Sequence, residues 1–217
     1  MITTLLYDMD GLLLDTEPLW GECMMAVAQR HGIAMTPERL RATTGLRIYE
    51  VCDHWAEHYP WQGSTATQVA TEILDDVIRE SCVRGGILPG IEQSLKAARS
   101  AGLKTAVATS SPARMMDTLL ETYCLRDYFD GVYSADAVQY GKPHPAVFLH
   151  AAAELGTTPS QCCVLEDSVN GMIAAKAARM KVIVVPNQLH FDDPRFALAD
   201  AKLRTMEDFD VAMLNVL

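Results

Sequence analysis

The sequence lacks the features that mark several common classes of protein. It contains six cysteines, but none stand in Cys-x-x-Cys spacing and no histidine pair lies at zinc-ligand distance from them. No apolar run approaches the roughly 18 residues that a membrane span requires. The N-terminus has no positive segment and leads straight into an apolar run, which argues against a signal peptide. We therefore expect a soluble, cytoplasmic protein with reduced cysteines.

Positive charge is also scarce. The chain has 18 Lys and Arg residues against 28 Asp and Glu residues, which gives a formal net charge of −10 with neutral histidine. A surface this acidic argues against nucleic acid or an anionic membrane as a partner. The hydrophobic fraction of 49% is ample for a packed core, and 217 residues suit a core of ordinary size with a smaller insertion.

Apolar runs predict the strands of an α/β core. They lie at 3–7, 105–108, 132–133, 163–165 and 182–185. Helical patterns separate the later runs and lie near 90–101, from 112 onward, near 145–155 and near 169–179. Strands that alternate with helices of this length predict a parallel sheet with right-handed crossovers.

The segment after the first strand has a different pattern, with no convincing strand. Residues 20–31 follow one helical face that ends at Gly32, and a second helix covers 69–82. Between them, Thr36-Pro37-Glu38 predicts a helix start and Gly45-Leu46-Arg47 predicts a break. We therefore predict two domains, a discontinuous core of residues 1–15 and 86–217 and an all-helical insertion of residues 16–85.

Polar residues stand at the ends of several predicted strands. In chain order they are Asp8 and Asp10 after 5–7, Thr109 and Ser110 after 106–108, Lys142 in Gly141-Lys142-Pro143, and Glu166 and Asp167 after 163–165. Open parallel sheets place their active sites at such strand ends. Carboxylates, a hydroxyl and a lysine at one sheet edge favour a site for a phosphate group and a divalent cation.

Charge counting supports a metal ion in this site. Asp8, Glu166 and Asp167 bring about three negative charges, and a phosphate monoester adds up to about two more. At about 4 Å and an effective dielectric constant near 20, each like-charge pair costs on the order of 4 kcal/mol. Lys142 alone does not offset this repulsion, so a divalent cation is required, and oxygen ligands beside a phosphate indicate Mg²⁺.

Ser111-Pro112 predicts the start of the helix that follows the strand at 105–108. Serine is a good N-cap residue, and proline is favoured at the first helical position. A helix that begins there would direct its free N–H groups toward the space beside Thr109, where a phosphate group would bind.

In the order of these motifs, the sequence resembles phosphatases of the haloacid dehalogenase superfamily that carry a helical cap after the first motif. The resemblance covers essentially the whole chain, including the cap position and the segment from Leu165 to Gly171. It is strongest to the β-phosphoglucomutase-like group, which includes bacterial phosphatases of 2-deoxyglucose 6-phosphate and of hexitol phosphates. The resemblance implies a Rossmann-like core and a mobile helical cap that closes over a small substrate.

The resemblance also implies catalytic roles. Asp8 would be the nucleophile that forms an aspartyl-phosphate, and Asp10 would be the general acid and then the general base. Thr109, the backbone N–H of Ser110 and Lys142 would bind the phosphoryl oxygens.

For the metal, the resemblance implies Mg²⁺ held by Asp8, the Asp10 carbonyl and Asp167, with Glu166 at or just behind the metal ligands. In the cap, Trp20 and Arg47 would contact the substrate. For Arg47, a solvated surface position is an equally good interpretation.

The alternative activity is that of a β-phosphoglucomutase-type isomerase with the same nucleophile. Where the mutase pattern has a cap histidine, five residues after Asp15, this chain has Trp20, and no lysine occurs between Gly11 and Leu95 to hold a second phosphate. A phospho-accepting receiver domain is near half this length and carries its acceptor on a later strand. We therefore predict a monomeric enzyme that hydrolyses small phosphate monoesters with Mg²⁺, with hexose 6-phosphates such as 2-deoxyglucose 6-phosphate as the expected substrates.

Overall fold

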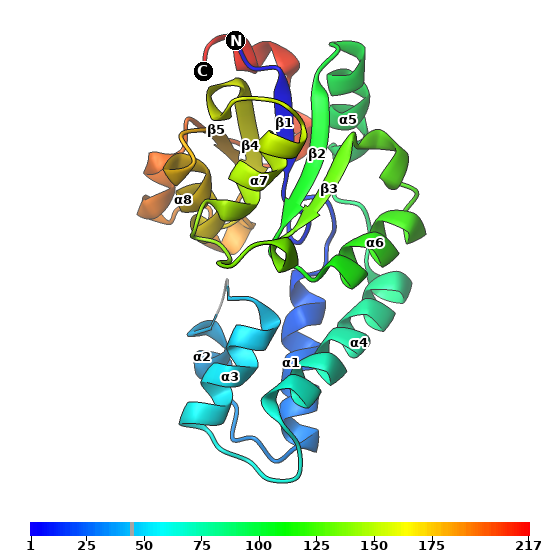
Figure 1. Cartoon of the computed structure of the whole chain (residues 1–217), viewed down its shortest axis with the longest axis vertical. Coiled ribbons are helices and arrows are strands. Elements are labelled where there is room, and N and C mark those ends of the chain that lie inside the picture. The colour runs from blue at the N-terminus through cyan, green and yellow to red at the C-terminus, as the bar shows by residue number, and fades with distance from the viewer. Residues whose placement is uncertain (44–45) are drawn as a thin grey trace. The chain divides into compact units, whose positions relative to one another are not determined.

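The computed structural model describes residues 1–43 and 46–217. The chain forms two compact units, which we call the core unit (Met1–Asp15 and Ile87–Leu217) and the helical unit (Thr16–Gly86). Figure 1 shows the elements of both units along the chain. Gly45, in the segment where we predicted a break, lies outside the described residues.

The core unit is built on a six-stranded sheet whose paired strands are all parallel (Figure 1). The strand order is β3-β2-β1-β4-β5-β6. The strands are β1 (Thr4–Tyr7), β2 (Lys104–Thr109), β3 (Gly131–Ser134), β4 (Cys162–Glu166), β5 (Lys181–Val184) and β6 (Ala201–Lys202). The predicted parallel α/β fold is confirmed, but β6 was missed because a two-residue edge strand leaves no apolar pattern.

Four α-helices of the core unit follow its strands and cover the sheet. They are α5 (Ile91–Ser100), α6 (Ala113–Thr122), α7 (Ala146–Glu154) and α8 (Val169–Ala177). The helices predicted near 90–101, 145–155 and 169–179 are confirmed to within one or two residues at each end. The prediction that Ser111 caps the next helix is wrong, because Pro112 is the N-cap residue of α6 and the Ser111 hydroxyl donates its hydrogen bond elsewhere.

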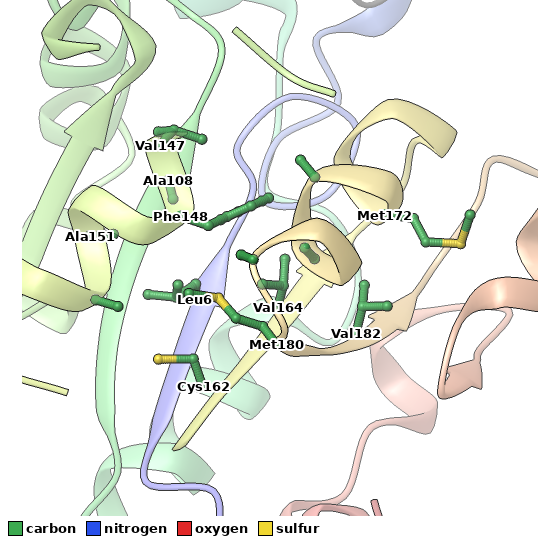
Figure 2. Packing of buried hydrophobic residues seen from close by; sticks show 14 of the residues in the cluster. Leu6, Ala108, Val147, Phe148, Ala151, Cys162, Val164, Met172, Met180 and Val182 are labelled. Carbon is green, nitrogen blue, oxygen red and sulfur yellow. The ribbon is translucent and has the colours of Figure 1, made fainter. Parts of the chain in front are cut away.

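Successive residues of the central strands face opposite sides of the sheet, as the period of two requires. Leu6 of β1 belongs to a buried cluster with Phe148 of α7 and Met172 of α8 (Figure 2). Tyr7, the next residue, belongs to the other face, where its hydroxyl donates to Ser94 of α5 over 3.4 Å. Because helices cover both faces, these strands are apolar throughout, and the site can form only at the ends of the strands.

The helical unit contains α1 (Glu17–Arg30), α2 (Pro37–Arg41), α3 (Ile48–His58) and α4 (Ala66–Arg84). Its described residues include no β-strand, as predicted. The predicted helix start at Thr36 is also confirmed, since its side chain accepts a hydrogen bond from the N–H of Arg39 at 3.3 Å. Across the described part of both units, no helix combines the length and the hydrophobicity that crossing a membrane demands.

Candidate active site

The end of β1 places two aspartates at the carboxyl edge of the sheet. Asp8 directly follows the strand and is 7% exposed. The chain then turns back, because the N–H groups of 13–14 both donate to the carbonyl of Met9 and Gly11 adopts a φ of 75°. Glycine adopts this left-handed conformation at little steric cost. The resulting tight loop carries Asp10 at the same edge as Asp8.

The ammonium group of Lys142 joins the ends of three neighbouring strands. Its Nζ lies 2.6 Å from Asp8 Oδ1, 2.8 Å from Glu166 Oε1 and 3.0 Å from the carbonyl oxygen of Ala108. An ammonium group has three hydrogens to donate, so each one has an acceptor. The same Nζ lies 4.7 Å from the centre of the Phe148 ring, which adds a cation–π contact at a side chain that is almost fully buried.

Glu166 is fully buried, and both of its carboxylate oxygens accept hydrogen bonds. Oε1 faces Lys142, while Oε2 accepts from the N–H and the hydroxyl of Ser168 at 2.8 and 2.9 Å. Ser168 is also the N-cap residue of α8, because its Oγ accepts from the N–H of Gly171 at 3.0 Å. The start of α8 therefore fixes Glu166, and Glu166 in turn fixes Lys142.

Burial of these charges shifts their pKa values. Burial raises the pKa of Asp8 to about 7, an effect that Lys142 opposes and Glu166 reinforces. Burial by itself lowers the pKa of Lys142, but the two carboxylates outweigh it and raise that pKa above its ordinary value. Lys142 is therefore positively charged, and ionised Asp8 needs more positive charge than Lys142 alone supplies.

A divalent cation fits the donor set of this cluster. Asp8, Glu166 and Asp167 are all buried, and each offers a carboxylate oxygen within 4.8 Å of the other two. Ligand sets made only of oxygen suit hard cations such as Mg²⁺. Since both oxygens of Glu166 already accept hydrogen bonds, Asp8 and Asp167 are the better candidates for direct metal ligands.

The loop after β2 brings hydroxyl groups to the same edge. Thr109 is 1% exposed, and its Oγ1 accepts from the N–H of Ser111 at 3.0 Å. The hydroxyl of Ser111 donates to Oδ2 of Asp10 at 2.5 Å. Ser110 lies between them and is half-buried. The ends of β1, β2 and β4 thus bring acidic and hydroxyl groups to one edge of the sheet, and Lys142, from the segment between β3 and α7, adds its ammonium group. This arrangement is expected for handling a phosphoryl group.

A model of the haloacid dehalogenase-like hydrolases matches residues 5–185 of the chain. This span begins within β1 and ends just after β5, so it includes every site residue described above. This chain belongs to that family. The resemblance inferred from the motifs is therefore confirmed, and the chain is a haloacid dehalogenase-like hydrolase.

Individual relatives of this hydrolase share most of its length. Hexitol phosphatase B of Escherichia coli (strain K12) is 41% identical over 208 residues, which cover 95% of this chain and 94% of that protein. Fructose-1-phosphate phosphatase YqaB of the same organism is 31% identical and covers 83% of this chain and 95% of its own. The crystal structure of CbbY from Rhodobacter sphaeroides in complex with phosphate superposes with a TM-score of 0.88 at 26% sequence identity. The match covers 99% of this chain and 100% of the CbbY chain. The enzyme class is that of a phosphoric monoester hydrolase.

Two residues predicted to bind substrate belong to the helical unit of the hydrolase. Trp20 is half-buried on α1. Arg47 immediately precedes α3, where its Nε donates to Oε1 of Glu50 at 2.9 Å. This ion pair was not anticipated from the sequence. Contacts of Trp20 and Arg47 with substrate stay predictions.

Sequence reasoning assigned no site role to three residues that the structure connects to the candidate site residues Asp10 and Glu166. They are Ser111, Ser168 and Gly171. Ser168 followed by Gly171 just after a strand is a readable helix-start signal. For Ser111, the Ser-Pro pattern predicted a helix cap, whereas the hydroxyl donates to Asp10. A serine before a proline is compatible with either contact, so the sequence did not distinguish them.

Proposed function

We propose that this hydrolase cleaves small phosphate monoesters with Mg²⁺, through an aspartyl-phosphate on Asp8. The proposed substrates are sugar phosphates, foremost hexose 6-phosphates such as 2-deoxyglucose 6-phosphate and the related hexitol phosphates. The names of hexitol phosphatase B and of fructose-1-phosphate phosphatase support a phosphorylated sugar or sugar alcohol.

The observation that carries the proposal is the buried ion cluster around Lys142. Its ammonium group contacts Asp8 and Glu166, and Asp167 lies beside them. Burying an ammonium group among carboxylates costs desolvation free energy, and such clusters of buried charge are concentrated at functional sites where chemistry needs both signs of charge. Phosphoryl transfer is such chemistry, because an anionic nucleophile must approach an anionic ester.

In the proposed reaction, Asp8 is the nucleophile and Asp10 transfers the protons. An oxygen of Asp8 attacks phosphorus while Lys142 and the loop of Thr109 and Ser110 hold the phosphoryl oxygens. The electron pair of the broken P–O bond moves to the ester oxygen, which takes a proton from Asp10 and leaves as the alcohol. Asp10 then removes a proton from water, whose oxygen attacks phosphorus and releases Asp8 and inorganic phosphate.

A divalent cation held by Asp8 and Asp167 would supply the charge that makes the approach of the phosphate favourable. It would act on Asp8, a buried carboxylate whose pKa burial raises although Lys142 lowers it. We propose Mg²⁺ because all candidate ligands are oxygen atoms.

Phosphate release from a panel of sugar and nucleotide monophosphates, with Mg²⁺ or with EDTA, tests this function. We expect Mg²⁺-dependent release with hexose or hexitol phosphates preferred. Asp8→Asn should lower kcat/KM on the order of 10³-fold or more, because it removes the nucleophile. Asp117→Asn, which makes the same change at an exposed position of α6, should behave as the wild type.

Two results would overturn the proposal. Release that persists unchanged in EDTA or in Asp8→Asn would reject the metal or the nucleophile. Conversion of β-glucose 1-phosphate to glucose 6-phosphate without phosphate release would favour the mutase over the phosphatase.

We propose further that the protein acts as a monomer in the cytoplasm on a diffusible substrate. All six of its cysteines are free thiols, which suits a reducing compartment. Its net charge of −10 disfavours nucleic acid as a partner. Trp20 and Arg47, both in the helical unit, are proposed to contact the substrate and to determine which substrates are preferred.

A further inference from the structure

Ser111 makes a partly buried hydrogen bond that neither a helix cap nor the binding of phosphate explains. Its hydroxyl donates to Oδ2 of Asp10 at 2.5 Å, across a sequence separation of 101 residues. The serine itself is 7% exposed. A serine just before a helix commonly satisfies the first free N–H groups of that helix. Here the side chain reaches the carboxylate of Asp10, in the loop after β1, instead.

The backbone of Ser111 is held on both sides, so the position of its hydroxyl is well defined. On one side its N–H donates to Oγ1 of Thr109 at 3.0 Å. On the other side its carbonyl accepts from the hydroxyl of Ser134 at 2.6 Å, at the end of β3. The end of β3 therefore holds the loop after β2, and this loop in turn holds the side chain of Asp10.

The start of α6 is fastened by the loop after β3. Asp136 accepts a hydrogen bond from the N–H of Ala113 at 2.9 Å through its Oδ2, and its own N–H donates to Oγ of Ser134 at 3.1 Å. Asp136 thus supplies the cap that the sequence led us to expect from Ser111. Because α6 has this other cap, the hydroxyl of Ser111 is available to Asp10.

We propose that Ser111 is a positioning residue that orients the carboxyl group of Asp10 for both of its proton transfers. The inference rests on the proposed function, in which Asp10 first protonates the leaving oxygen and then deprotonates water. A donor on Oδ2 fixes the rotation of the carboxyl group, and an error of about 1 Å in such a group costs up to about 100-fold in rate. Without Ser111, Asp10 is present but misdirected.

The leaving group of the substrate separates this role from a general structural one. A sugar alkoxide needs a proton in order to leave, whereas p-nitrophenolate and acetate are stable anions and need little help. The parameter kcat/KM covers the reaction only through the first irreversible step, the departure of the leaving group. Loss of acid positioning should therefore lower kcat/KM for a hexose phosphate much more than for p-nitrophenyl phosphate or acetyl phosphate.

The experiment compares Ser111→Ala, Ser111→Thr and the wild type, in Mg²⁺, on the best hexose phosphate of the panel and on both activated esters. We expect the ratio of kcat/KM for the hexose phosphate to that for p-nitrophenyl phosphate to fall about 10-fold or more in Ser111→Ala. Ser111→Thr, which keeps the hydroxyl, should restore the ratio to within about 3-fold. Ser100→Ala, which makes the same change at the exposed last residue of α5, is the matched control.

A second readout follows from the base role of Asp10. If Ser111→Ala slows the attack of water, the phosphorylated enzyme accumulates, and a burst of p-nitrophenolate of about one equivalent should precede a slower steady state. If Ser111→Ala proves unstable, Ser134→Ala provides a second test, because it removes the hydrogen bond to the Ser111 carbonyl and keeps the Ser111 hydroxyl. It should also lower the ratio of kcat/KM for the hexose phosphate to that for p-nitrophenyl phosphate.

The outcomes separate the two proposals. An equal loss of kcat/KM on all esters, or no loss on any, would overturn the role of Ser111 while leaving the phosphatase intact. If the wild type releases no phosphate from any ester, the proposed function fails instead. A ratio that falls in Ser111→Ala and returns in Ser111→Thr supports the positioning role.

Discussion

At the scale of single residues, Gly171 determines how closely Glu166 can approach the backbone of α8. It lies in the first turn of α8, and a Cβ atom built on it would stand 1.6 Å from Oε1 of Glu166. No side chain fits at such a distance, so the carboxylate lies directly against the helix backbone. Because the same oxygen accepts from Lys142, the absence of a side chain at 171 is what permits the ion cluster to form.

We predict that Gly171→Ala lowers both stability and activity. An alanine inside a helix is ordinarily favoured over glycine by about 1 kcal/mol. Here the added methyl group must displace Glu166, which should destabilise the protein by about 1–3 kcal/mol and reduce kcat/KM about 10-fold or more. Urea unfolding and phosphate-release kinetics measure the two effects.

Gly21→Ala is the matched control for this prediction. Gly21 is also helical, but a Cβ there would meet only Cδ2 of Leu40 at 4.0 Å, an ordinary contact distance. The control should therefore be neutral or more stable. If Gly171→Ala also gains stability and keeps full activity, the close approach of Glu166 has no functional consequence.

Single residues also show how far the sequence alone could lead. The acids after β1 and β4 and Lys142 could be expected to meet, because parallel strands end at one edge of a sheet. The hydrogen-bond partner of Ser111 could not be predicted. A hydroxyl group can donate to many kinds of acceptor, and only the folded chain shows which acceptor lies near it. Gly171 has no side-chain group that could indicate a role in the sequence. Its role follows only from the short distance between its backbone and the carboxylate of Glu166.

At the scale of elements, the strands were predictable because helices cover both faces of the sheet and make each strand continuously apolar. The two-residue β6 falls below the length at which any pattern can be recognised. The start of α6 was placed one residue early because the cap is supplied from a distant loop by Asp136. Local sequence does not contain that information.

A buried aspartate forms an ion pair between α1 and α4. Asp76 of α4 is 8% exposed and contacts Arg30 of α1 and Nη1 of Arg79, the latter at 2.7 Å. Burial alone raises the pKa of Asp76, but the two arginines outweigh it and hold the pKa below its ordinary value. The ionised form is therefore the one that stabilises the helical unit.

We predict that Asp76→Asn destabilises the protein by about 1–2 kcal/mol at pH 7, because the arginines are partly exposed and screened. An acid with a lowered pKa contributes its stabilisation above its unfolded-state pKa of about 4 and loses it as the pH falls through its folded-state value. The difference between variant and wild type should therefore shrink below about pH 4. Urea unfolding at several pH values measures it.

Asp53→Asn, at an exposed position of α3, provides the control for this change. It should leave the free energy of unfolding within about 0.5 kcal/mol of the wild type at every pH. An Asp76→Asn penalty that stays constant from pH 7 to pH 3 would show that packing, and not the charge of Asp76, holds the two helices.

At the scale of the whole molecule, the 71-residue helical unit (Thr16–Gly86) is inserted into the core unit. The core residues just before and just after the insertion are hydrogen-bonded to each other. The N–H of Leu88 donates to the carbonyl of Leu13 at 3.0 Å, and Leu14 forms an antiparallel bridge with Ile87. Leu14 also bridges Asp10. The loop that carries Asp10 therefore also anchors the point where the chain returns to the core unit.

The central claim for the molecule is that phosphate passes through a covalent bond to Asp8. Asp10→Asn offers the means to see it, because p-nitrophenolate leaves without an acid whereas the attack of water still needs a base. The variant, mixed with p-nitrophenyl phosphate and Mg²⁺ and quenched in acid, should carry one phosphoryl group on the peptide that contains Asp8, as mass spectrometry would show. An unmodified peptide, or a phosphoryl group on another residue, in a protein whose wild type hydrolyses the same ester would contradict the account.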